Sequence, residues 1–214
     1  MQKVTKVKDL FTQKVRKATA LEKQILRLED ELDRKCNTVA MLVFPAFALS
    51  LYRDYGFKKR HVEGCLAAVR RTYDDVSGDD VSMIQLCKEE TGIDVSDESE
   101  KTWEELTYLS SNRWDEWLKE HPNATQRQYQ MYLLATRQRQ LKWIEPTLYS
   151  SIFVAMHRRE KFGFDRNTQL YANIKALTQQ YKSNELIALC KAEIGLDLLI
   201  KDGQFLFGKE EEED

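Results

Sequence analysis

The sequence predicts an all-α fold: a helical bundle with an internally duplicated three-helix unit and a long N-terminal helix. Three observations support this prediction. Only 8 Gly and 3 Pro interrupt 214 residues, and strand-rich folds normally need more turn-forming residues than that. Hydrophobic residues make up 42% and charged residues 32% of the chain, which is typical of a helical protein with a packed core. Apolar residues also recur at helical spacing along most of the chain.

Residues 1–37 are predicted to form one long amphipathic helix. Apolar residues recur there at alternating three- and four-residue steps, which is a heptad pattern. The pattern consists of Val4, Val7, Phe11, Lys14, Ala18, Leu21, Ile25, Leu28, Leu32 and Lys35. Such a stripe packs either along its own chain or against a second copy in a homodimeric coiled coil, and the sequence leaves both alternatives open.

Two segments, 38–95 and 146–205, repeat the same series of features. Each has an apolar helix followed by a Gly-Phe pair, a second helix, and a third helix that ends in "LCKEETGID" or "LCKAEIGLD". We expect Gly56, Gly163, Gly92 and Gly195 to close these helices in the left-handed conformation that favours glycine. The second helices share one spacing of apolar residues, which aligns Val62, Leu66, Val69 and Tyr73 with Leu170, Ile174, Leu177 and Tyr181. The sequence therefore predicts a duplicated unit.

An insert at 96–145 separates the two copies, and residues 206–214 form an acidic tail. Thr125 and Gln128 match a capping box, which predicts the start of a helix that reaches Ile144. We expect Pro146 to end that helix or to open the next one.

Charge is strongly segregated along the chain although the net charge is only −2. Residues 1–17, 53–73 and 121–166 carry +5, +4 and +5, whereas residues 74–120 carry −11. In the plainest interpretation these charges pair with each other or face water. Two functional interpretations are also open, and each concerns one sign of charge.

The acidic insert, with its tryptophans, is a candidate surface for docking into the basic groove of a protein partner. The candidate residues are Asp97, Glu98, Glu100, Trp103, Glu104, Glu105, Trp114, Asp115, Glu116 and Trp117. The basic residues are candidates for binding the phosphates of nucleic acid. They are Arg53, Lys58, Lys59, Arg60, Arg70, Arg71, Arg158, Arg159, Lys161 and Arg166.

No motif for phosphate binding or for a catalytic nucleophile occurs, and we expect no catalytic residue and no cofactor. His61 and Cys65 lie one helical turn apart, and Cys87 is a third potential metal ligand. Because the second copy has no counterpart and a fourth ligand is not evident, we expect no metal site. Glu90 and Glu193 recur in the third helices, where we expect a solvated or capping role.

The helix, Gly-Phe break and basic helix, followed by "LCKEETGID", resemble small helical proteins encoded by prophages and mobile elements of Gram-positive bacteria. The resemblance covers residues 39–95 and 146–200. Lys58 and Asp165 stand where a second Gly often follows in those proteins. It implies a bacterial genomic setting, and some phage proteins of this size and helicity, including anti-CRISPR proteins, inhibit bacterial immunity.

These observations predict a non-enzymatic phage or mobile-element protein in the bacterial cytoplasm. We expect it to bind and inhibit a nucleic-acid-targeting defence machine, such as a CRISPR effector. The alternative is a nucleic-acid-binding protein with two units similar to a helix-turn-helix. We do not expect a membrane-spanning segment, because the longest uncharged run, Cys36–Tyr52, is interrupted by Pro45 and is better explained as a buried helix.

Overall fold

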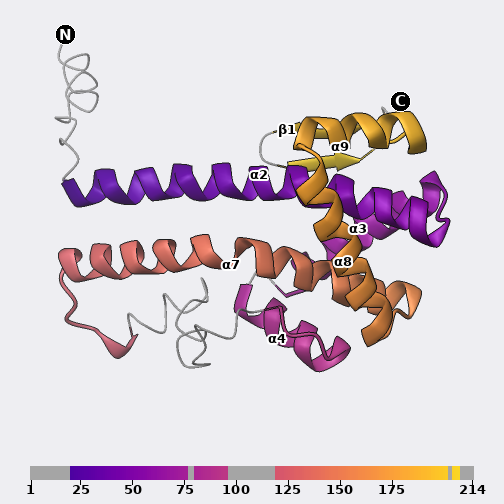
Figure 1. Ribbon diagram of the computed structural model, residues 1–214. Helices are drawn as coiled ribbons and strands as arrows, with labels where there is room; N and C mark the ends of the chain where they lie inside the picture. Colours follow the sequence, from indigo (N-terminus) through magenta and orange to yellow (C-terminus); the bar gives the residue numbers. More distant parts are fainter. Residues whose placement is uncertain (1–19, 77–79, 96–118, 202–203, 208–214) are drawn as a thin grey trace, which may run out of the picture.

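Two long helices that run side by side form the backbone of the fold (Figure 1). They are α2 (Ala20–Tyr55) and α7 (Gln126–Glu160). This is a computed structural model, and it describes residues 20–76, 80–95, 119–201 and 204–207. The fold is all-α, as predicted, apart from one short β-hairpin near the C-terminus.

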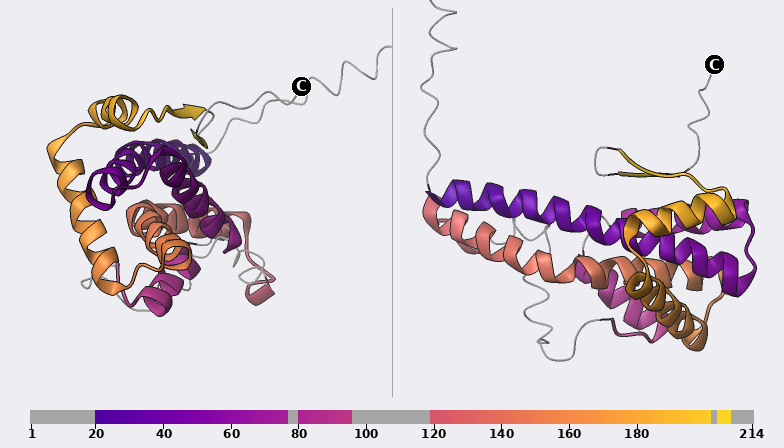
Figure 2. Two further views of the ribbon diagram at one scale, coloured as in Figure 1. Left: turned by 90° about the vertical axis from the view of Figure 1, so that its right-hand side faces the viewer. Right: turned by 45° about the horizontal axis from the view of Figure 1, so that its top comes forward.

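The two long helices are parallel, and contacts along their N-terminal halves fix their register. The Gln130 side-chain amide donates a hydrogen bond to Glu22 at 3.2 Å. About two helical turns further on, Arg137 forms an ion pair with Glu29 at 3.6 Å. Further still, Lys35 donates a hydrogen bond to the backbone carbonyl of Leu141. Partners advance in the same direction along both helices, and Figures 1 and 2 show the two helices running side by side.

The apolar stripe of the N-terminal helix packs along its own chain where it is described. Ile25 is buried, and Leu21, Leu28 and Leu32 are half-buried on the helix that lies beside α7. Leu26, which falls outside the heptad stripe, is exposed. The heptad positions from Val4 to Ala18 lie outside the described residues, and a homodimer through this helix stays a prediction.

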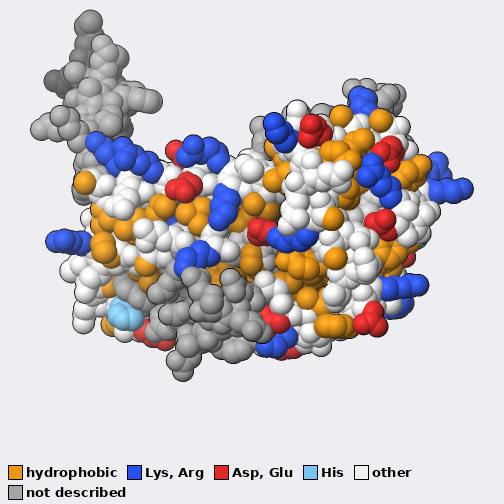
Figure 3. Space-filling view, viewed as in Figure 1, with side chains coloured by type: hydrophobic (Ala, Val, Ile, Leu, Met, Phe, Trp, Pro, Cys, Tyr) orange, Lys and Arg blue, Asp and Glu red, His pale blue; other side chains and the backbone are white. Residues whose placement is uncertain are grey.

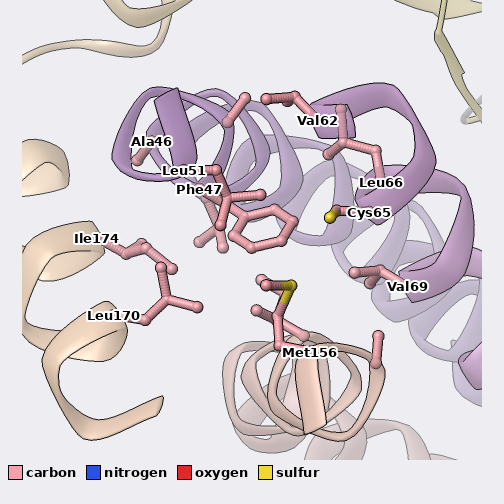
Figure 4. Packing of buried hydrophobic residues seen from close by; sticks show 14 of the residues in the cluster. Ala46, Phe47, Leu51, Val62, Cys65, Leu66, Val69, Met156, Leu170 and Ile174 are labelled. Carbon is pink, nitrogen blue, oxygen red and sulfur yellow. The ribbon is translucent and has the colours of Figure 1, made fainter. Parts of the chain in front are cut away.

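The remaining helices pack around the C-terminal halves of α2 and α7 (Figure 2). These are α3 (Lys59–Asp75), α4 (Asp80–Thr91), α8 (Phe164–Gln180) and α9 (Ser183–Leu189), the last continued by a π-helical turn, η3 (Cys190–Ile194). Figure 4 shows the core that they enclose, in which side chains of α3 and α8 surround Phe47 and Met156. Both of these side chains are fully buried.

Each third helix packs against the first helix of the other half. α4 lies along α7, and α9 with η3 lies along α2. Two salt bridges stabilise this arrangement. Glu90 of α4 binds Arg158 of α7, and Glu193 of η3 binds Arg53 of α2. The two halves of the chain are therefore interlocked and do not form separate units.

The first long helix ends as the sequence predicts. Gly56 has φ +70°, and the amide of Phe57 donates to the carbonyl of Leu51 at 3.0 Å. This bond spans the helix end in the way that a left-handed residue allows. The third helices also end as predicted, because Gly92 and Gly195 have φ of +75° and +73°.

The predicted end of the second long helix is wrong. Gly163 has φ −82° and ψ −173°, which is extended backbone, and it is the N-cap of α8. The left-handed residue is Lys161, with φ 59°, and the Phe162 amide donates to the carbonyl of Met156 at 3.3 Å. Phe162 is buried, whereas Phe164 of the Gly-Phe pair is 55% exposed. Lysine adopts this left-handed conformation at a cost of about 1 kcal/mol. The position of a glycine therefore did not identify the residue that ends this helix.

The second helices of the two halves correspond in a register different from the predicted one. Both have 17 residues and begin three residues after a left-handed residue. Their buried residues then align as Val62 with Asn167, Cys65 with Leu170, and Val69 with Ile174. The predicted alignment is shifted by about one helical turn from the observed one. The shift arises because the apolar pattern of a helix resembles itself when it is displaced by one turn. Origin of the two halves by duplication stays a prediction.

Both long helices run through the expected segment boundaries at 37/38 and 145/146. Pro146 lies inside α7, as Pro45 lies inside α2, so the break expected at Pro146 is wrong. The capping box at the start of α7 is confirmed, since the Thr125 side chain accepts from the Gln128 amide and the Gln128 side chain accepts from the Thr125 amide. Each internal proline removes one backbone hydrogen-bond donor from its helix. Packing against the neighbouring helices outweighs the cost of that lost bond here.

The chain continues after Gly195 into a hairpin that the sequence analysis missed. Strand β1 (Leu198–Lys201) pairs antiparallel with β2 (Gln204–Phe207). Leu198 is buried against the bundle. The second strand crosses the boundary at which we had expected an acidic tail to begin.

Replacing Gly56 and Gly163 by alanine tests the corrected helix end. A Cβ at either position meets nothing within 4 Å, so only backbone conformation distinguishes the two substitutions. Gly56→Ala should lower the free energy of unfolding by about 1 kcal/mol, because φ is positive there. Gly163→Ala should change it by less than about 0.5 kcal/mol, because the stiffer unfolded chain offsets the loss of a favoured N-cap residue. Urea unfolding of both variants measures this, and an equal loss in both would contradict the structure.

Candidate functional site

A groove of about 750 Å³ lies between α2, α3 and α7. The middle of α2 forms one wall, the middle of α7 forms the other, and the C-terminal half of α3 lies at the groove as well. The groove is lined by Glu29, Leu32, Asp33, Cys36, Asn37, Ala40, Phe44, Leu66, Val69, Arg70, Tyr73, Asp74, Arg137, Gln140, Ile144, Thr147, Leu148 and Ser151. A concave surface of this size with a largely apolar lining is typical of a binding site.

The lining combines buried apolar side chains with charged side chains of both signs. Leu66 and Val69 of α3 are almost fully buried. Around them lie Arg70 and Asp74, which form an ion pair at 3.9 Å along α3, and the Arg137–Glu29 ion pair between α7 and α2. Because Phe44, Ile144 and Leu148 of the lining are only half-buried, the groove offers an apolar surface bounded by charge. Figure 3 shows that hydrophobic side chains also gather along the line where α2 and α7 meet.

Two polar atoms in the groove lining have no hydrogen-bond partner among the described residues. They are the hydroxyl of Thr147 and Nε of Arg137. Thr147 is only 4% exposed, so its hydroxyl is desolvated without compensation from the chain. Both atoms are themselves buried, so a group that enters the groove would reach them only after a side-chain rotation. The sequence did not indicate them.

The groove also contains an exposed thiol. Cys36 is exposed, whereas Cys65, Cys87 and Cys190 are buried. Burial, together with neighbouring Glu160, raises the pKa of Cys65 to about 12, and burial with Glu193 does the same for Cys190. Burial also raises the pKa of Cys87. Such thiols are poor nucleophiles at neutral pH.

The structure gives five of the ten predicted phosphate-binding residues a carboxylate partner within the chain. Lys59 and Arg70 form ion pairs with acids one turn along α3. Arg159 binds the neighbouring Glu160. Arg53 and Arg158 hold the two third helices through bidentate contacts, with Nε–carboxylate distances of 2.9 Å in each case. Lys58, Arg60, Arg71, Lys161 and Arg166 are exposed.

The carboxylates in these bidentate pairs, Glu90 and Glu193, had been expected to be solvated or to cap the helix ends. Instead, each bridges two helices. The guanidinium groups of Arg158 and Arg53 hold the pKa of Glu90 and Glu193, respectively, below the ordinary value. The acidic docking residues from Asp97 to Trp117 lie outside the described residues, and their role stays a prediction.

Comparison with protein families, with curated proteins and with solved structures finds no match for this chain.

Within the described part of the chain, α2 is the one helix whose length and apolar composition alone would allow it to cross a membrane. A buried helix of a soluble protein meets the same criterion, and 44% of the most apolar window of α2 is buried in the bundle. The predicted cytoplasmic location stays a prediction.

Substituting the bridging glutamates should reveal a pH-dependent contribution to stability. Because the folded-state pKa is lowered, the contribution is present above the unfolded value of about 4.3 and is lost as the pH falls below it. Glu90→Gln and Glu193→Gln should each lower the free energy of unfolding by at most about 1 kcal/mol at neutral pH, since the pairs are partly exposed and screened.

Chemical unfolding at neutral pH and at about pH 3, which is below the unfolded-state pKa of about 4.3, measures this difference. Glu89→Gln, one residue before Glu90 and exposed, is the matched control and should have little effect. If the glutamine variants lose as much stability in acid as at neutral pH, the loss does not come from charge pairing.

Proposed function

We propose that this protein is a non-enzymatic binding protein that docks on a protein partner, and that the groove between α2, α3 and α7 receives a segment of that partner. The observation that carries the proposal is the groove itself, an apolar depression bounded by charges of both signs. Amphipathic helices and extended segments commonly bind in grooves of this kind.

The chemistry of the lining defines what such a segment must offer. Phe44, Ile144 and Leu148, which line the groove and are half-buried, favour an apolar side chain on the partner. After a side-chain rotation, Thr147 and Arg137 each present a polar atom that a backbone carbonyl or side-chain oxygen of the partner can accept from. Because the unpartnered hydroxyl of Thr147 is already desolvated, forming this bond recovers energy that the free protein lacks.

We further propose that the partner is a bacterial nucleic-acid-targeting defence machine, such as a CRISPR effector. This narrower proposal is supported by the resemblance to prophage proteins and by the −11 charge of residues 74–120. Acidic surfaces can occupy a basic nucleic-acid groove in place of the nucleic acid itself. Direct nucleic-acid binding is less well supported, because five of the ten candidate residues pair with carboxylates of this chain.

The experiment compares two tryptophan substitutions in an inhibition assay. Purified protein is titrated into target-DNA cleavage reactions catalysed by a panel of CRISPR effectors. Ala40→Trp places a large side chain in the groove. Ala172→Trp, at an exposed position of α8, is the matched control. We expect stoichiometric inhibition by the wild type and by Ala172→Trp, and inhibition weakened at least about tenfold by Ala40→Trp.

Labelling of Cys36 with a maleimide provides an independent measure of docking. A bound partner should slow this reaction, because Cys36 lies in the groove and is the exposed thiol. Equal inhibition by the two tryptophan variants, with unchanged labelling, would exclude the groove as the docking site. If the wild type inhibits none of the effectors, the narrower proposal is wrong, even where Cys36 is protected by another partner.

A further inference from the structure

Three potential metal ligands meet where α3 begins and α7 ends. His61 and Cys65 lie one turn apart on α3, and Glu160 is the last residue of α7. Their ligand atoms, an imidazole nitrogen, a thiol sulfur and a carboxylate oxygen, all lie within 4.8 Å of one another. Cys87, which the sequence offers as a third potential ligand although we expected no metal site, lies elsewhere and contacts Thr91.

Glu160 is the centre of this cluster. One of its carboxylate oxygens, Oε1, lies 2.8 Å from Nε2 of His61 and 3.7 Å from Sγ of Cys65. The thiol therefore contacts the carboxylate and does not pair with the imidazole. This arrangement does not fit a cysteine nucleophile activated by histidine, in which the thiol contacts the base directly.

The packing around the cluster holds its ligands in place. The His61 ring stacks on Phe57, with ring centres 4.0 Å apart and planes inclined by 4°. Cys65 is fully buried in the core, whereas the His61 side chain is 41% exposed. The cluster is thus anchored on its inner side by packing and open to solvent through the histidine.

The negative charge of Glu160, which a bound metal ion would neutralise, is already paired with an arginine. Nε of Arg159 lies 2.9 Å from the same carboxylate oxygen of Glu160. Its guanidinium comes so close to α3 that a Cβ on Gly64 would lie 2.6 Å from the terminal nitrogen. The Arg159 side chain is 38% exposed, so it can withdraw into solvent when another cation binds the carboxylate.

We propose that His61, Cys65 and Glu160 bind one divalent transition-metal ion of the zinc class. Nitrogen, sulfur and oxygen donors are the ligands of Zn²⁺ and Co²⁺. Small side-chain shifts would bring these three atoms to the tetrahedral spacing of about 3.3–3.8 Å, with a water molecule in the fourth position. A thiolate and an imidazole disfavour Mg²⁺ and Ca²⁺, which prefer oxygen ligands. In this arrangement Arg159 competes with the metal ion for Glu160.

The other half of the chain places different chemistry at the corresponding positions. There, Arg166 and Leu170 of α8 lie near the end of α2, where the Tyr55 hydroxyl donates to the carbonyl of Arg166 at 3.2 Å. These positions offer neither a thiol nor an imidazole. The proposal therefore requires one metal ion per chain, although the two halves have similar architecture.

Titration of the reduced, full-length protein with Co²⁺ tests the proposal, because cobalt bound to thiolate absorbs in the near ultraviolet and tetrahedral cobalt absorbs in the visible range. We expect both bands to saturate at one equivalent and to disappear on addition of Zn²⁺. Cys65→Ser should abolish the near-ultraviolet band. His61→Asn and Glu160→Gln should weaken cobalt binding at least about tenfold.

Two further variants make the result specific. Cys36→Ser removes the exposed thiol and should leave the spectrum unchanged. Arg159→Gln removes the competing cation and should tighten cobalt binding, which a merely structural His61–Glu160–Arg159 network does not predict. Circular dichroism confirms that each variant is folded.

Three results would overturn the proposal. They are the absence of saturable cobalt binding to the wild type, a near-ultraviolet band that survives Cys65→Ser in a folded protein, and a band that is lost in Cys36→Ser.

Discussion

The parallel packing of α2 against α7 is the constraint on which the rest of the structure depends. Because both helices run in the same direction, both of their C-terminal ends lie at one end of the molecule (Figure 1). The second helices, α3 and α8, must therefore start at that end, and their apolar faces enclose a common core around Phe47 and Met156. Parallel neighbours need a long connection, which the segment from α3 to the start of α7 supplies.

Each third helix packs against the long helix of the other half, and this packing interlocks the two halves in one bundle. The Arg158–Glu90 and Arg53–Glu193 contacts each join one half of the chain to the other, while Cys87 and Cys190 bury their thiols in the same two interfaces. The groove follows from the same geometry, since α3 covers the pair at only one end and leaves the α2–α7 surface beyond it open. The His61–Cys65–Glu160 cluster depends on it too, because only parallel long helices bring the end of α7 beside the start of α3.

Local features were predictable from the sequence, and contacts between distant residues were not. The helix ends at Gly56, Gly92 and Gly195 and the capping box at Thr125 follow from short-range backbone chemistry, and the structure confirms them. The end at Lys161 was missed because a lysine occupies the left-handed position and a Gly-Phe pair follows two residues later. Glu160 could not be assigned to His61, since 99 residues separate them and no local pattern links them. The groove was invisible for the same reason.

Cross-linking of cysteine pairs in a Cys36→Ser background measures the direction of α2 relative to α7 most directly. The side chains of Glu22 and Gln130 are in contact in the structure, so a short bis-maleimide should cross-link a Glu22→Cys, Gln130→Cys variant within the chain. A Glu22→Cys, Arg158→Cys variant should not be cross-linked, because Arg158 lies near the opposite end of α7, about 40 Å further along the helix. Cross-linking of the second pair within a monomer, and not of the first, would show antiparallel helices and contradict the account.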